Sequence, residues 1–395
     1  MTTVFVCLLF ASLVSCAASS VCDATTGLCS LHAPAYLSAS YASAQDLFDA
    51  YEAYHRAVLA DRELLARVPL VVFRVPGQGW ANRLRTFAST YLFAVLSGRV
   101  FLVDWNHPVP LERLIETVFP WSASLAGLTH VDLHRAYTYT CKGPYEGSGG
   151  KASSWLMLEQ QPLWSVLPEH RIFGISGYSA FTTAFHANPH AKPLMRLFDA
   201  ECPLRDIFPY LVRPAPAVAA AMQPLLARMR SADVMALQMR LGSATNYFEA
   251  GPVKSYLTDD LLAKYKSDTA YELWFDCAFK AVRADPALLV FLATDNPAAV
   301  TRAKELFGAN LLYYEAPIEH SGGIEKVKTD DGQTKAMVDW FLLGEASVLY
   351  RTYWSTYGYT ASLRTGVTTV TIPLEYSPTC ALPSKFLPGE FTNHC

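Results

Sequence analysis

Short apolar runs alternate with longer segments of helical period along most of the chain. The first clear set begins with an apolar run at residues 70–75, continues through a glycine loop and an apolar helix pattern that ends near Gly98, and closes with a second apolar run at 99–105. A strand, a helix and a strand in this order predict a βαβ unit, which requires parallel strands. Runs at 129–133 and 172–175 are expected to extend the same sheet.

A second series follows the Pro-rich stretch at residues 214–216, which we take as the domain boundary. Apolar runs and helical patterns alternate again, so a second doubly wound α/β domain is predicted. Its expected strands are 234–239, 288–294, 310–314, 348–352 and 368–372, and its expected helices are 218–230, 271–283, 297–307, 333–345 and 355–364. The predicted divisions are a helical lead-in at 19–67 (with a helix at 44–66), domains at 68–213 and 214–379, and a tail at 380–395.

The extreme N-terminus has a different character. Residues 4–14 form an apolar run with one serine, and the small residues Cys16 and Ala18 follow it. This length suits the apolar region of a signal peptide and is short for a membrane span. Residues 1–18 are therefore predicted to be a secretory signal peptide, although the usual Lys or Arg before the apolar run is missing. A signal anchor that is not cleaved is the alternative.

Cysteine content agrees with a secretory route, because disulfides persist mainly outside the cytosol. Of nine cysteines, two lie within residues 1–18, and the other seven are Cys22, Cys29, Cys141, Cys202, Cys277, Cys380 and Cys395. Cys22 and Cys29 flank a short polar segment and are predicted to form a local disulfide. The same prediction holds for Cys380 and Cys395. The odd number predicts one free thiol, and Cys277, within an apolar helix pattern, is the expected one.

Composition and charge exclude several classes of protein. Hydrophobic residues make up 51% of the chain and charged residues 17%, so it can bury sizeable cores and is not disordered. The formal net charge is −3 and no long Lys/Arg run occurs, which argues against nucleic acid or a membrane surface as a partner. Two Rossmann-like domains joined by a Pro-rich crossing in a secretory chain predict an α/β fold of GT-B type. In this glycosyltransferase architecture, two doubly wound domains face a cleft.

Polar clusters fall where predicted strands end, which is where open α/β sheets bind ligands. The first cluster is Gly-Gln-Gly-Trp-Ala-Asn-Arg at residues 77–83. Its Gly79 permits a close backbone approach, and Asn82 and Arg83 supply hydrogen-bond donors at a helix start. A dinucleotide-type Gly-x-Gly-x-x-Gly is not completed, because Asn82 stands at its last position. The alternative is a plain turn.

The second and third clusters follow two more predicted strands. Arg240 comes directly after an apolar strand that contains Gln238. An arginine at this place presents a rigid, always charged fork that suits a diphosphate, and the alternative is an interdomain salt bridge. Asp295 ends another buried strand and can accept a hydrogen bond from a ribose hydroxyl or a base N–H. The alternative for Asp295 is the cap of the helix at 297–307, and both roles can hold together.

The fourth cluster lies near the C-terminus, where a strand at 348–352 leads to Ser355 and Thr356 and then to a helix. The first N–H groups of a helix have no partner within it, and the helix dipole favours negative charge there. A phosphate is therefore the predicted ligand. The alternative is an ordinary helix cap, because Ser and Thr are preferred at that position in any helix.

These four segments, in this order, resemble motifs of the plant-type xyloglucan fucosyltransferases and, more broadly, of the α1,2/α1,6/protein-O-fucosyltransferase superfamily. Residues 77–84 resemble that group's Gly-x-Gly-Asn-Arg loop with an insertion, Trp-Ala at 80–81, and Gln-Met-Arg at 238–240 resembles its His/Gln-x-Arg strand end. Ala-Thr-Asp-Asn-Pro at 293–297 resembles its Ser-Asp-x-x segment. Asp-Trp-Phe-Leu-Leu at 339–343, with Trp-Ser-Thr-Tyr-Gly-Tyr at 354–359, resembles its Leu-Leu…Ser-Thr-Phe-Gly-Tyr signature.

The likeness spans residues 68–372, but the chain departs from the family pattern at several places. Ser243 follows Gly242 where the family often has an acidic residue, and Tyr357 stands where Phe is common. Residues 105–211, which should shape the acceptor site, match poorly.

The resemblance implies a GT-B fold, GDP-fucose as donor, and inversion at the anomeric carbon with no metal or other cofactor. It also implies a glycan or glycoprotein acceptor in the Golgi or ER lumen. By the resemblance, Arg240 is a catalytic residue that neutralises the leaving diphosphate, and Asp295 contacts the guanosine. Ser355, Thr356 and the Tyr357 backbone bind phosphate. Further donor contacts are implied for Gly79, Asn82, Arg83 and Gln238. The chain agrees in lacking Asp-x-Asp, with which metal-dependent GT-A enzymes hold their ion. Without a metal, Arg and helix N–H groups must offset the charge on the departing GDP.

No residue stands out as the general base that takes the acceptor proton. Asp104, at the end of the run 99–105, is the best-placed carboxylate and the predicted catalytic base, with a strand-end cap as the alternative. His107 and Glu112 are weaker candidates. Three rival functions remain: a GT-B transferase with another nucleotide sugar, a non-catalytic carbohydrate-binding relative, and a dinucleotide oxidoreductase.

Overall fold

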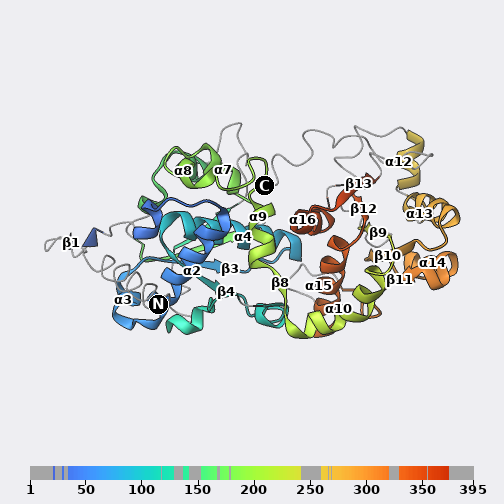
Figure 1. The fold of residues 1–395 in the computed structure, drawn as a ribbon, viewed down its shortest axis with the longest axis horizontal. Helices are drawn as coiled ribbons and strands as arrows, with labels where there is room; N and C mark the ends of the chain where they lie inside the picture. The colour runs from blue at the N-terminus through green and yellow to red at the C-terminus, as the bar shows by residue number, and fades with distance from the viewer. Residues whose placement is uncertain are drawn as a thin grey trace, which may run out of the picture.

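The computed structural model describes residues 34–116, 118–128, 137–141, 153–166, 170–177, 179–241, 259–265, 267, 269–319, 329–353 and 355–372, with two short strands, β1 (Val21–Cys22) and β2 (Cys29–Ser30). Its two main sheets lie on either side of helix α16 (Thr356–Thr365) along the long axis of the molecule (Figure 1). The segment 1–18, the run at 129–133, Gly242 with Ser243, and the tail 380–395 lie outside the described residues. Within the described part of the chain, no helix has both the length and the apolar character to cross a membrane.

The N-terminal sheet has four parallel strands in the order β4-β3-β7-β6. Their bounds are β3 (Leu70–Arg74), β4 (Val100–Asp104), β6 (Tyr137–Cys141) and β7 (Ile172–Gly177). Helix α4 (Trp80–Ser97) joins β3 to β4, which confirms the predicted βαβ unit. α4 ends at Gly98, whose φ is 70° and whose Cβ, if present, would lie 2.5 Å from the Pro34 ring. Glycine is therefore needed there for both the backbone conformation and the space.

The C-terminal sheet has five parallel strands in the order β11-β10-β9-β12-β13, the order of a doubly wound fold. The strands are β9 (Val234–Met239), β10 (Leu289–Thr294), β11 (Leu311–Leu312), β12 (Val348–Thr352) and β13 (Thr368–Ile372). The long helices of this half, besides α16, are α10 (Pro216–Met229), α13 (Glu272–Ala284), α14 (Pro297–Phe307) and α15 (Asp330–Gly344). Each predicted strand and helix is present, although β11 is shorter than expected and α15 begins at Asp330 rather than at residue 333.

Side chains of the C-terminal strands alternate between two cores, because successive residues of a strand point to opposite faces. In β9, Val234 and Ala236 belong to the core that contains α15, whereas Met235, Leu237 and Met239 pack with α13 and α14. Helices thus cover both faces of the sheet. That arrangement explains why these strands are continuous apolar runs in the sequence.

The N-terminal lead-in contains two helices rather than the single predicted one. α2 (Ala44–Ala60) ends at Asp61, whose carboxylate accepts hydrogen bonds from the N–H groups of Glu63 and Leu64 and so starts α3 (Arg62–Arg67). The remaining elements are α6 (Ser153–Gln160), α7 (Thr182–Ala187), α8 (Lys192–Met195), α9 (Leu204–Leu211), α12 (Asp259–Tyr265), β5 (Ile115–Glu116) and β8 (Arg213–Pro214), with five 3-10 turns. β8 pairs antiparallel with β5 just before α10 begins, and the domain division at residue 214 stays a prediction.

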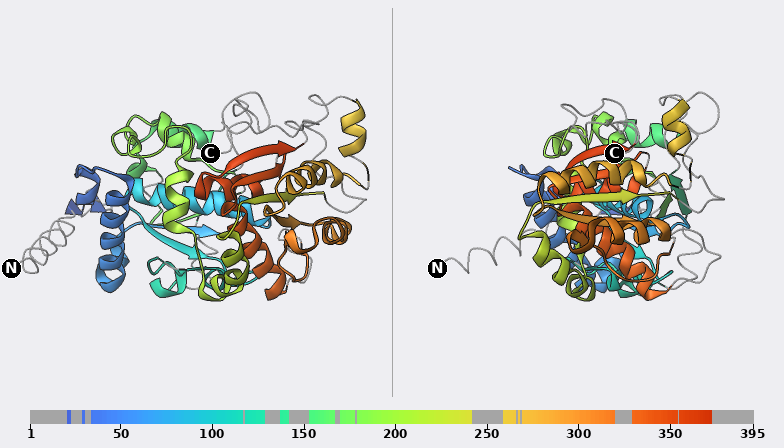
Figure 2. Two further views of the ribbon diagram at one scale, coloured as in Figure 1. Left: turned by 45° about the vertical axis from the view of Figure 1, so that its right-hand side comes forward. Right: turned by 90° about the vertical axis from the view of Figure 1, so that its right-hand side faces the viewer.

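The two halves share one hydrophobic core. Phe87 of α4 and Phe208 of α9 belong to the same buried cluster as Trp340 of α15 and Leu363 of α16. The rings of Phe208 and Trp340 meet edge to face, with centroids 6.0 Å apart. The left view of Figure 2 agrees with this packing, since helix α16, in red, lies between α4, in cyan, and the red strands of the second sheet. Apolar packing therefore joins the two sheets directly.

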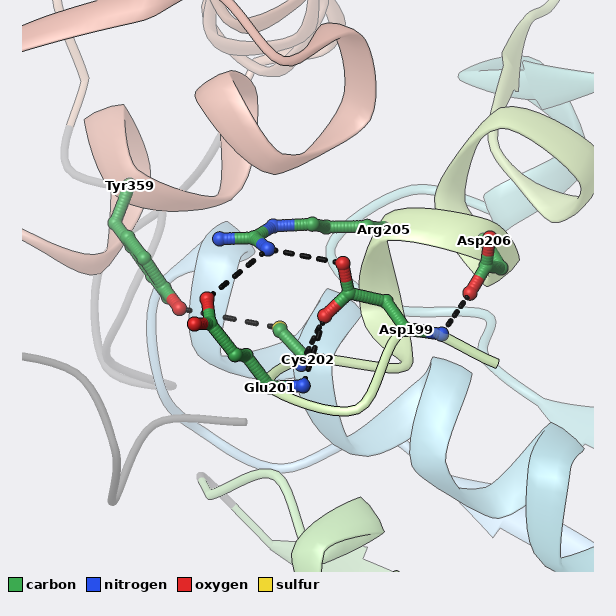
Figure 3. Close-up of polar contacts among 6 residues, drawn as sticks. All are labelled: Asp199, Glu201, Cys202, Arg205, Asp206 and Tyr359. Atoms are coloured by element: carbon green, nitrogen blue, oxygen red, sulfur yellow. Dashed lines mark hydrogen bonds and ion pairs between the residues drawn. The ribbon is translucent and has the colours of Figure 1, made fainter. Parts of the chain in front are cut away.

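A polar turn before α9 reinforces this joint (Figure 3). The Asp199 carboxylate accepts hydrogen bonds from the N–H groups of Glu201 and Cys202, and it pairs with Arg205 at 3.0 Å. Burial acts to raise the pKa of Asp199, but these N–H groups and Arg205 outweigh it, so the pKa is lowered. Tyr359 of α16 reaches the turn from the other half, and its hydroxyl lies 3.9 Å from Sγ of Cys202. The turn is thus well ordered by hydrogen bonds where the two halves meet.

One cysteine prediction is wrong. Cys277 lies buried in α13, as expected, but it is disulfide-bonded rather than free, and Cys202 is disulfide-bonded as well. An apolar helix pattern identifies a buried cysteine, but it carries no information about a second cysteine that folding brings to it. In the short N-terminal hairpin, the backbone register places Cys22 opposite Cys29, and their disulfide stays a prediction.

His55 on α2 gives the fold a pH dependence. Its side chain is fully buried, its Nε2–H donates to the Phe101 carbonyl at 2.8 Å, and its Nδ1 has no partner among the described residues. Burial lowers the pKa of His55 to about 4, while the bond to Phe101 opposes the shift and the charge of Arg56 adds to it. Protonation therefore favours the unfolded chain. The contribution of neutral His55 to the stability of the folded state is complete above pH 6.5, the ordinary pKa, and is lost as the pH falls towards 4.

We expect His55 to remove about 2 kcal/mol from the free energy of unfolding between pH 7 and pH 5. Urea titrations at the two pH values measure this loss. In His55→Gln, whose amide can still donate to the Phe101 carbonyl, this part of the pH dependence should vanish. His190→Gln, at an exposed histidine, is the matched control and should keep it. Equal pH dependence in His55→Gln and the wild type would contradict the prediction.

Candidate functional site

A cavity of about 380 Å³ lies where the two halves face each other. Its walls come from the loop between β3 and α4, the ends of β9 and β10, the N-terminal half of α15 and the start of α16. The predicted site residues that line it are Gly79, Asn82, Gln238, Arg240, Asp295, Ser355, Thr356 and Tyr357. Most of them meet because the carboxyl ends of parallel strands lie along one edge of each sheet.

Arg240 and Asp295 form an ion pair at the ends of the adjacent strands β9 and β10. Arg240 Nη1 lies 2.7 Å from Asp295 Oδ2, and the two side chains are 25% and 19% exposed. Asp295 Oδ1 accepts a hydrogen bond from the Leu241 N–H at 2.8 Å. The Arg240 N–H donates to Thr352 Oγ1, also at 2.8 Å. The guanidinium is therefore held in place on the cavity wall, with Asp295 as its support.

The alternatives for these two residues need correction. The salt bridge of Arg240 lies within one half of the molecule and not between the halves. Asp295 does not cap α14, because the neighbouring Asn296 does so with a side-chain oxygen that accepts from the N–H groups of Ala298 and Ala299. The predicted contact of Asp295 with guanosine stays a prediction, and the carboxylate as folded faces Arg240.

The start of α16 offers backbone N–H groups to the cavity. Ser355 occupies the cap position, but its side chain makes no capping hydrogen bond. The first bond of the helix runs from the Tyr359 N–H to the Ser355 carbonyl, so the N–H groups before it have no partner within the helix. The Tyr357 hydroxyl donates to the Ala336 carbonyl and fixes its ring against α15. Ser355 is thus not an ordinary helix cap.

Gln238 and Gly358 seat this helix start on the sheet. Gln238 is buried, and its Oε1 accepts from the Thr352 N–H at 3.2 Å. A Cβ on Gly358 would lie 2.7 Å from that Oε1 and 2.9 Å from Cβ of Arg351. Glycine at 358 therefore allows the first turn of α16 to pack directly on β9 and β12, close to Arg240.

The structure adds two residues to which the sequence assigned no role. Lys335 and Asp339 lie one turn apart on α15, line the cavity and are almost fully buried. Lys335 Nζ lies 3.0 Å from Asp339 Oδ2 and donates to the Tyr314 carbonyl at 2.8 Å. Asp339 Oδ1 has no hydrogen-bond partner among the described residues. Burial raises the pKa of Asp339 to about 6 against the lowering effect of Lys335, so the group is largely ionised at neutral pH.

Residues 317–319 close one side of the cavity. The Glu319 carboxylate accepts hydrogen bonds from the Thr329 N–H at 3.0 Å and from the Thr329 hydroxyl at 2.7 Å. That hydroxyl in turn accepts from the Gly332 N–H in the first turn of α15. The segment is thus fastened to the helix that carries Asp339. No periodic pattern marks these residues, so the sequence offered no signal for them.

Arg83, a predicted donor contact, does not line the cavity. Its side chain is buried, and its guanidinium lies 5.8 Å and 5.5 Å from the ring centroids of Trp80 and Trp105. Burial lowers the pKa of Arg83 to about 10. The residue supports the glycine loop from behind, and its contact with a donor stays a prediction.

Asp104, the predicted base, also lies outside the cavity lining. It ends β4 beside Arg74, which ends β3, and the two side chains approach to 3.9 Å. The weaker candidates His107 and Glu112 are exposed and do not line the cavity either. Among the described residues, the N-terminal wall of the cavity therefore contributes Gln78 and Asn82 as its polar side chains, but no carboxylate.

Comparison with solved structures identifies the fold. The chain is similar to a variant of FUT1 from Arabidopsis thaliana in complex with GDP, with a TM-score of 0.55 and 14% identity over 82% of this chain and 78% of that one. The chain has a GT-B fold. The predicted pair of Rossmann-like, doubly wound domains facing a cleft is thereby confirmed.

Two further solved structures show a weaker likeness to the chain. The fucosyltransferase NodZ from Bradyrhizobium has a TM-score of 0.43 and 14% identity over 74% of this chain and 92% of that chain. POFUT1 in complex with GDP has a TM-score of 0.43 and 12% identity over 77% and 98%. No family model and no curated protein sequence matches the chain.

Proposed function

We propose that the protein transfers L-fucose from GDP-fucose to a hydroxyl group of a glycan or glycoprotein, with inversion at the anomeric carbon and without a metal. The observation that carries the proposal is the content of the cavity: a guanidinium held in place, an uncapped helix start and a buried carboxylate with a free oxygen. A nucleoside diphosphate requires positive charge and N–H donors for its phosphates and an acceptor for its base. The motif resemblance, and the GDP bound by the similarly folded FUT1 variant, support the choice of donor.

The diphosphate is assigned to Arg240 and the start of α16. When the bond between fucose and the β-phosphate breaks, negative charge develops on the departing GDP. Donors that are already in place stabilise that charge more than they stabilise the bound substrate. Arg240 meets this condition because Asp295 holds its guanidinium and Thr352 accepts from its backbone N–H. Arg240 and the N–H groups of α16 thus take the place of a metal, and the absence of a metal stays a prediction.

We assign the guanine base to Asp339. The base edge of guanine carries an N1–H and a 2-amino group side by side, and a carboxylate oxygen accepts from such donors. Asp339 Oδ1 is a carboxylate oxygen in the cavity wall that has no hydrogen-bond partner among the described residues, while Oδ2 is paired with Lys335. Uracil and adenine offer a single donor on the corresponding edge, so they would satisfy this carboxylate less well.

Inversion requires the acceptor to attack from the side opposite to GDP. The acceptor oxygen forms a bond to C1 of fucose while the bond from C1 to the phosphate oxygen breaks, and that electron pair leaves with GDP. The acceptor approaches from the N-terminal wall, where Gln78 and Asn82 offer hydrogen bonds to sugar hydroxyls. The acceptor proton must pass to a base or to water. Asp104 remains the proposed base, because it ends β4 in the half to which we assign the acceptor.

A donor panel tests the function. GDP release is measured with GDP-fucose, GDP-mannose, UDP-galactose and UDP-glucose, together with a mixture of glycan acceptors. We expect release from GDP-fucose to exceed that from each other donor by about 100-fold or more, because correct placement of the sugar is needed for transfer. Turnover of a UDP-sugar instead would favour the rival transferase. Calorimetry that detects no GDP binding would favour the non-catalytic relative.

A secretory location completes the proposal. The apolar run at residues 4–14, the small residues after it and the disulfide-bonded Cys202 and Cys277 support it. Cell fractionation of a tagged full-length chain should place it in the Golgi or ER, and a cytosolic majority would contradict the proposal.

A further inference from the structure

Trp80 ends the glycine loop, where Trp80 and Ala81 stand as two residues more than the Gly-x-Gly-Asn-Arg pattern that the segment resembles. It is the first residue of α4, is 1% exposed and lines the cavity. Its ring stacks on Trp105, with centroids 4.8 Å apart and planes 23° apart. The guanidinium of Arg83 covers both rings from behind. These contacts fix the Trp80 ring within the N-terminal half.

The indole of Trp80 also reaches the C-terminal half. Its Nε1–H donates to Oε1 of Gln333 at 2.9 Å, and Gln333 is fully buried in α15. The same helix makes an ion pair across the halves between Asp330 and Arg113, but both side chains are more than half exposed, and such surface pairs contribute little. A buried indole N–H that loses its acceptor is costly. The hydrogen bond therefore favours one spacing of the two halves at this point.

Both ends of this bond adjoin the cavity walls. Gly79 precedes Trp80 and lines the N-terminal wall, while Lys335 and Asp339 follow Gln333 on α15 and line the opposite wall. We propose that the Trp80–Gln333 hydrogen bond is a tie between the halves, and that Trp80 is a positioning residue for the transfer reaction. The tie sets the distance between the glycine loop and the bound donor. This inference rests on the proposed function, which supplies the donor.

The placement of the two walls gives the tie a distinct kinetic signature. The groups assigned to GDP, namely Arg240, Asp339 and the start of α16, all lie in the C-terminal half. The loop that faces the sugar and its acceptor lies in the N-terminal half. A looser tie displaces the loop while the GDP site stays intact, so kcat falls while the affinity for GDP does not.

A double-mutant cycle tests the tie. Trp80→Phe keeps an aromatic ring on Trp105 but removes the N–H, and Gln333→Met keeps the length of the side chain but removes the acceptor. We expect each variant to lower kcat by about 10-fold, with the Kd for GDP, measured by calorimetry, within about twofold of the wild type. The double variant should be no slower than either single one. Trp121→Phe is the matched control: Trp121 is buried in the N-terminal half, its Nε1 has no partner among the described residues, and kcat should stay within about twofold.

Several results would overturn the tie. They are losses that multiply in the double variant, an equal loss of kcat in Trp121→Phe, unchanged kcat in either single variant, or a Kd for GDP that weakens in parallel. If the wild type releases no GDP from GDP-fucose, the proposed function fails, and the tie is then judged from urea unfolding. Coupling between the two substitutions in the free energy of unfolding supports the bond between the halves, and strict additivity overturns it.

Discussion

Replacing Arg240 by alanine is expected to lower the kcat of fucose transfer by about 100- to 1,000-fold. The substitution removes a cation that Asp295 holds on the wall of the cavity, which the start of α16 also lines. Its charge acts on the leaving diphosphate, which gains negative charge only as the sugar departs. The loss should therefore appear mainly in kcat, with a smaller weakening of GDP binding. Coupled detection of released GDP, and calorimetry for binding, measure the two effects.

Matched variants distinguish an effect of the Arg240 charge on transfer from an effect of the substitution on folding. Arg302→Ala removes a partly exposed arginine of the same half that pairs with Glu272, and it should leave kcat unchanged. Arg240→Lys keeps a charge but loses the planar fork, so most of the loss should remain. Asp295→Asn keeps Arg240 but loosens its support, and an intermediate loss is expected. Thermal melting checks that each variant is folded. Activity of Arg240→Ala within a few-fold of the wild type would remove Arg240 from the mechanism.

The strands of the C-terminal half could be predicted because each one is marked by its own run of consecutive apolar residues. A parallel strand covered by helices on both faces must be apolar throughout, so β9, β10 and β12 are visible as continuous runs. The polar residues directly after those runs then had to lie at one edge of the sheet. That argument alone brings Arg240, Asp295 and Ser355 to one cavity, as the structure shows. β6 carries alternating Thr and Tyr at the edge of its sheet, and the pattern did not predict it.

Residues that depend on contacts distant in the sequence were harder to assign. Arg83 has the expected motif and helix position. Its guanidinium, however, packs on the ring of Trp105, 22 positions later, and does not reach the cavity. Lys335 and Asp339 have the spacing of an ordinary surface pair, and it is the tertiary packing of α15 beside Tyr313, Tyr314 and α16 that buries them. The disulfide of Cys277 is a further case. In each, the decisive partner is set by the tertiary fold and not by local pattern.

The second large effect is expected at Asp339. In Asp339→Asn, the Kd for GDP should rise by about 10- to 100-fold at pH 7.5, because an amide oxygen replaces a charged acceptor at the donor edge of guanine. Inosine diphosphate lacks the 2-amino group of guanine. The wild type should therefore bind it more weakly than GDP, and Asp339→Asn should distinguish the two ligands far less. Asp276→Asn, in the exposed pair of Asp276 with Lys280 on α13, is the control and should bind GDP normally.

The pH dependence of binding gives an independent check on the same carboxylate. Its pKa is raised to about 6 by burial, so below that pH the free protein carries a neutral Asp339, and the wild type should lose GDP affinity as the pH falls from 7 to 5. The terminal phosphate of GDP titrates in the same range, so the difference between the wild type and Asp339→Asn, rather than the wild-type curve, reports Asp339. Parallel curves for the two proteins would exclude Asp339 from base recognition.

In the unliganded protein, ionisation of Asp339 should lower the free energy of unfolding, although the same ionisation favours GDP binding. A carboxyl whose pKa is raised in the folded state destabilises that state when ionised, and the penalty appears as the pH rises from its ordinary pKa of 3.8 towards 6. Asp339→Asn should therefore raise the free energy of unfolding at pH 7.5 while it weakens GDP binding. Urea titrations measure the first change and calorimetry the second. A gain in stability together with weaker GDP binding is the trade expected of a carboxylate retained for a ligand, whereas a gain in stability with unchanged GDP binding would contradict that role.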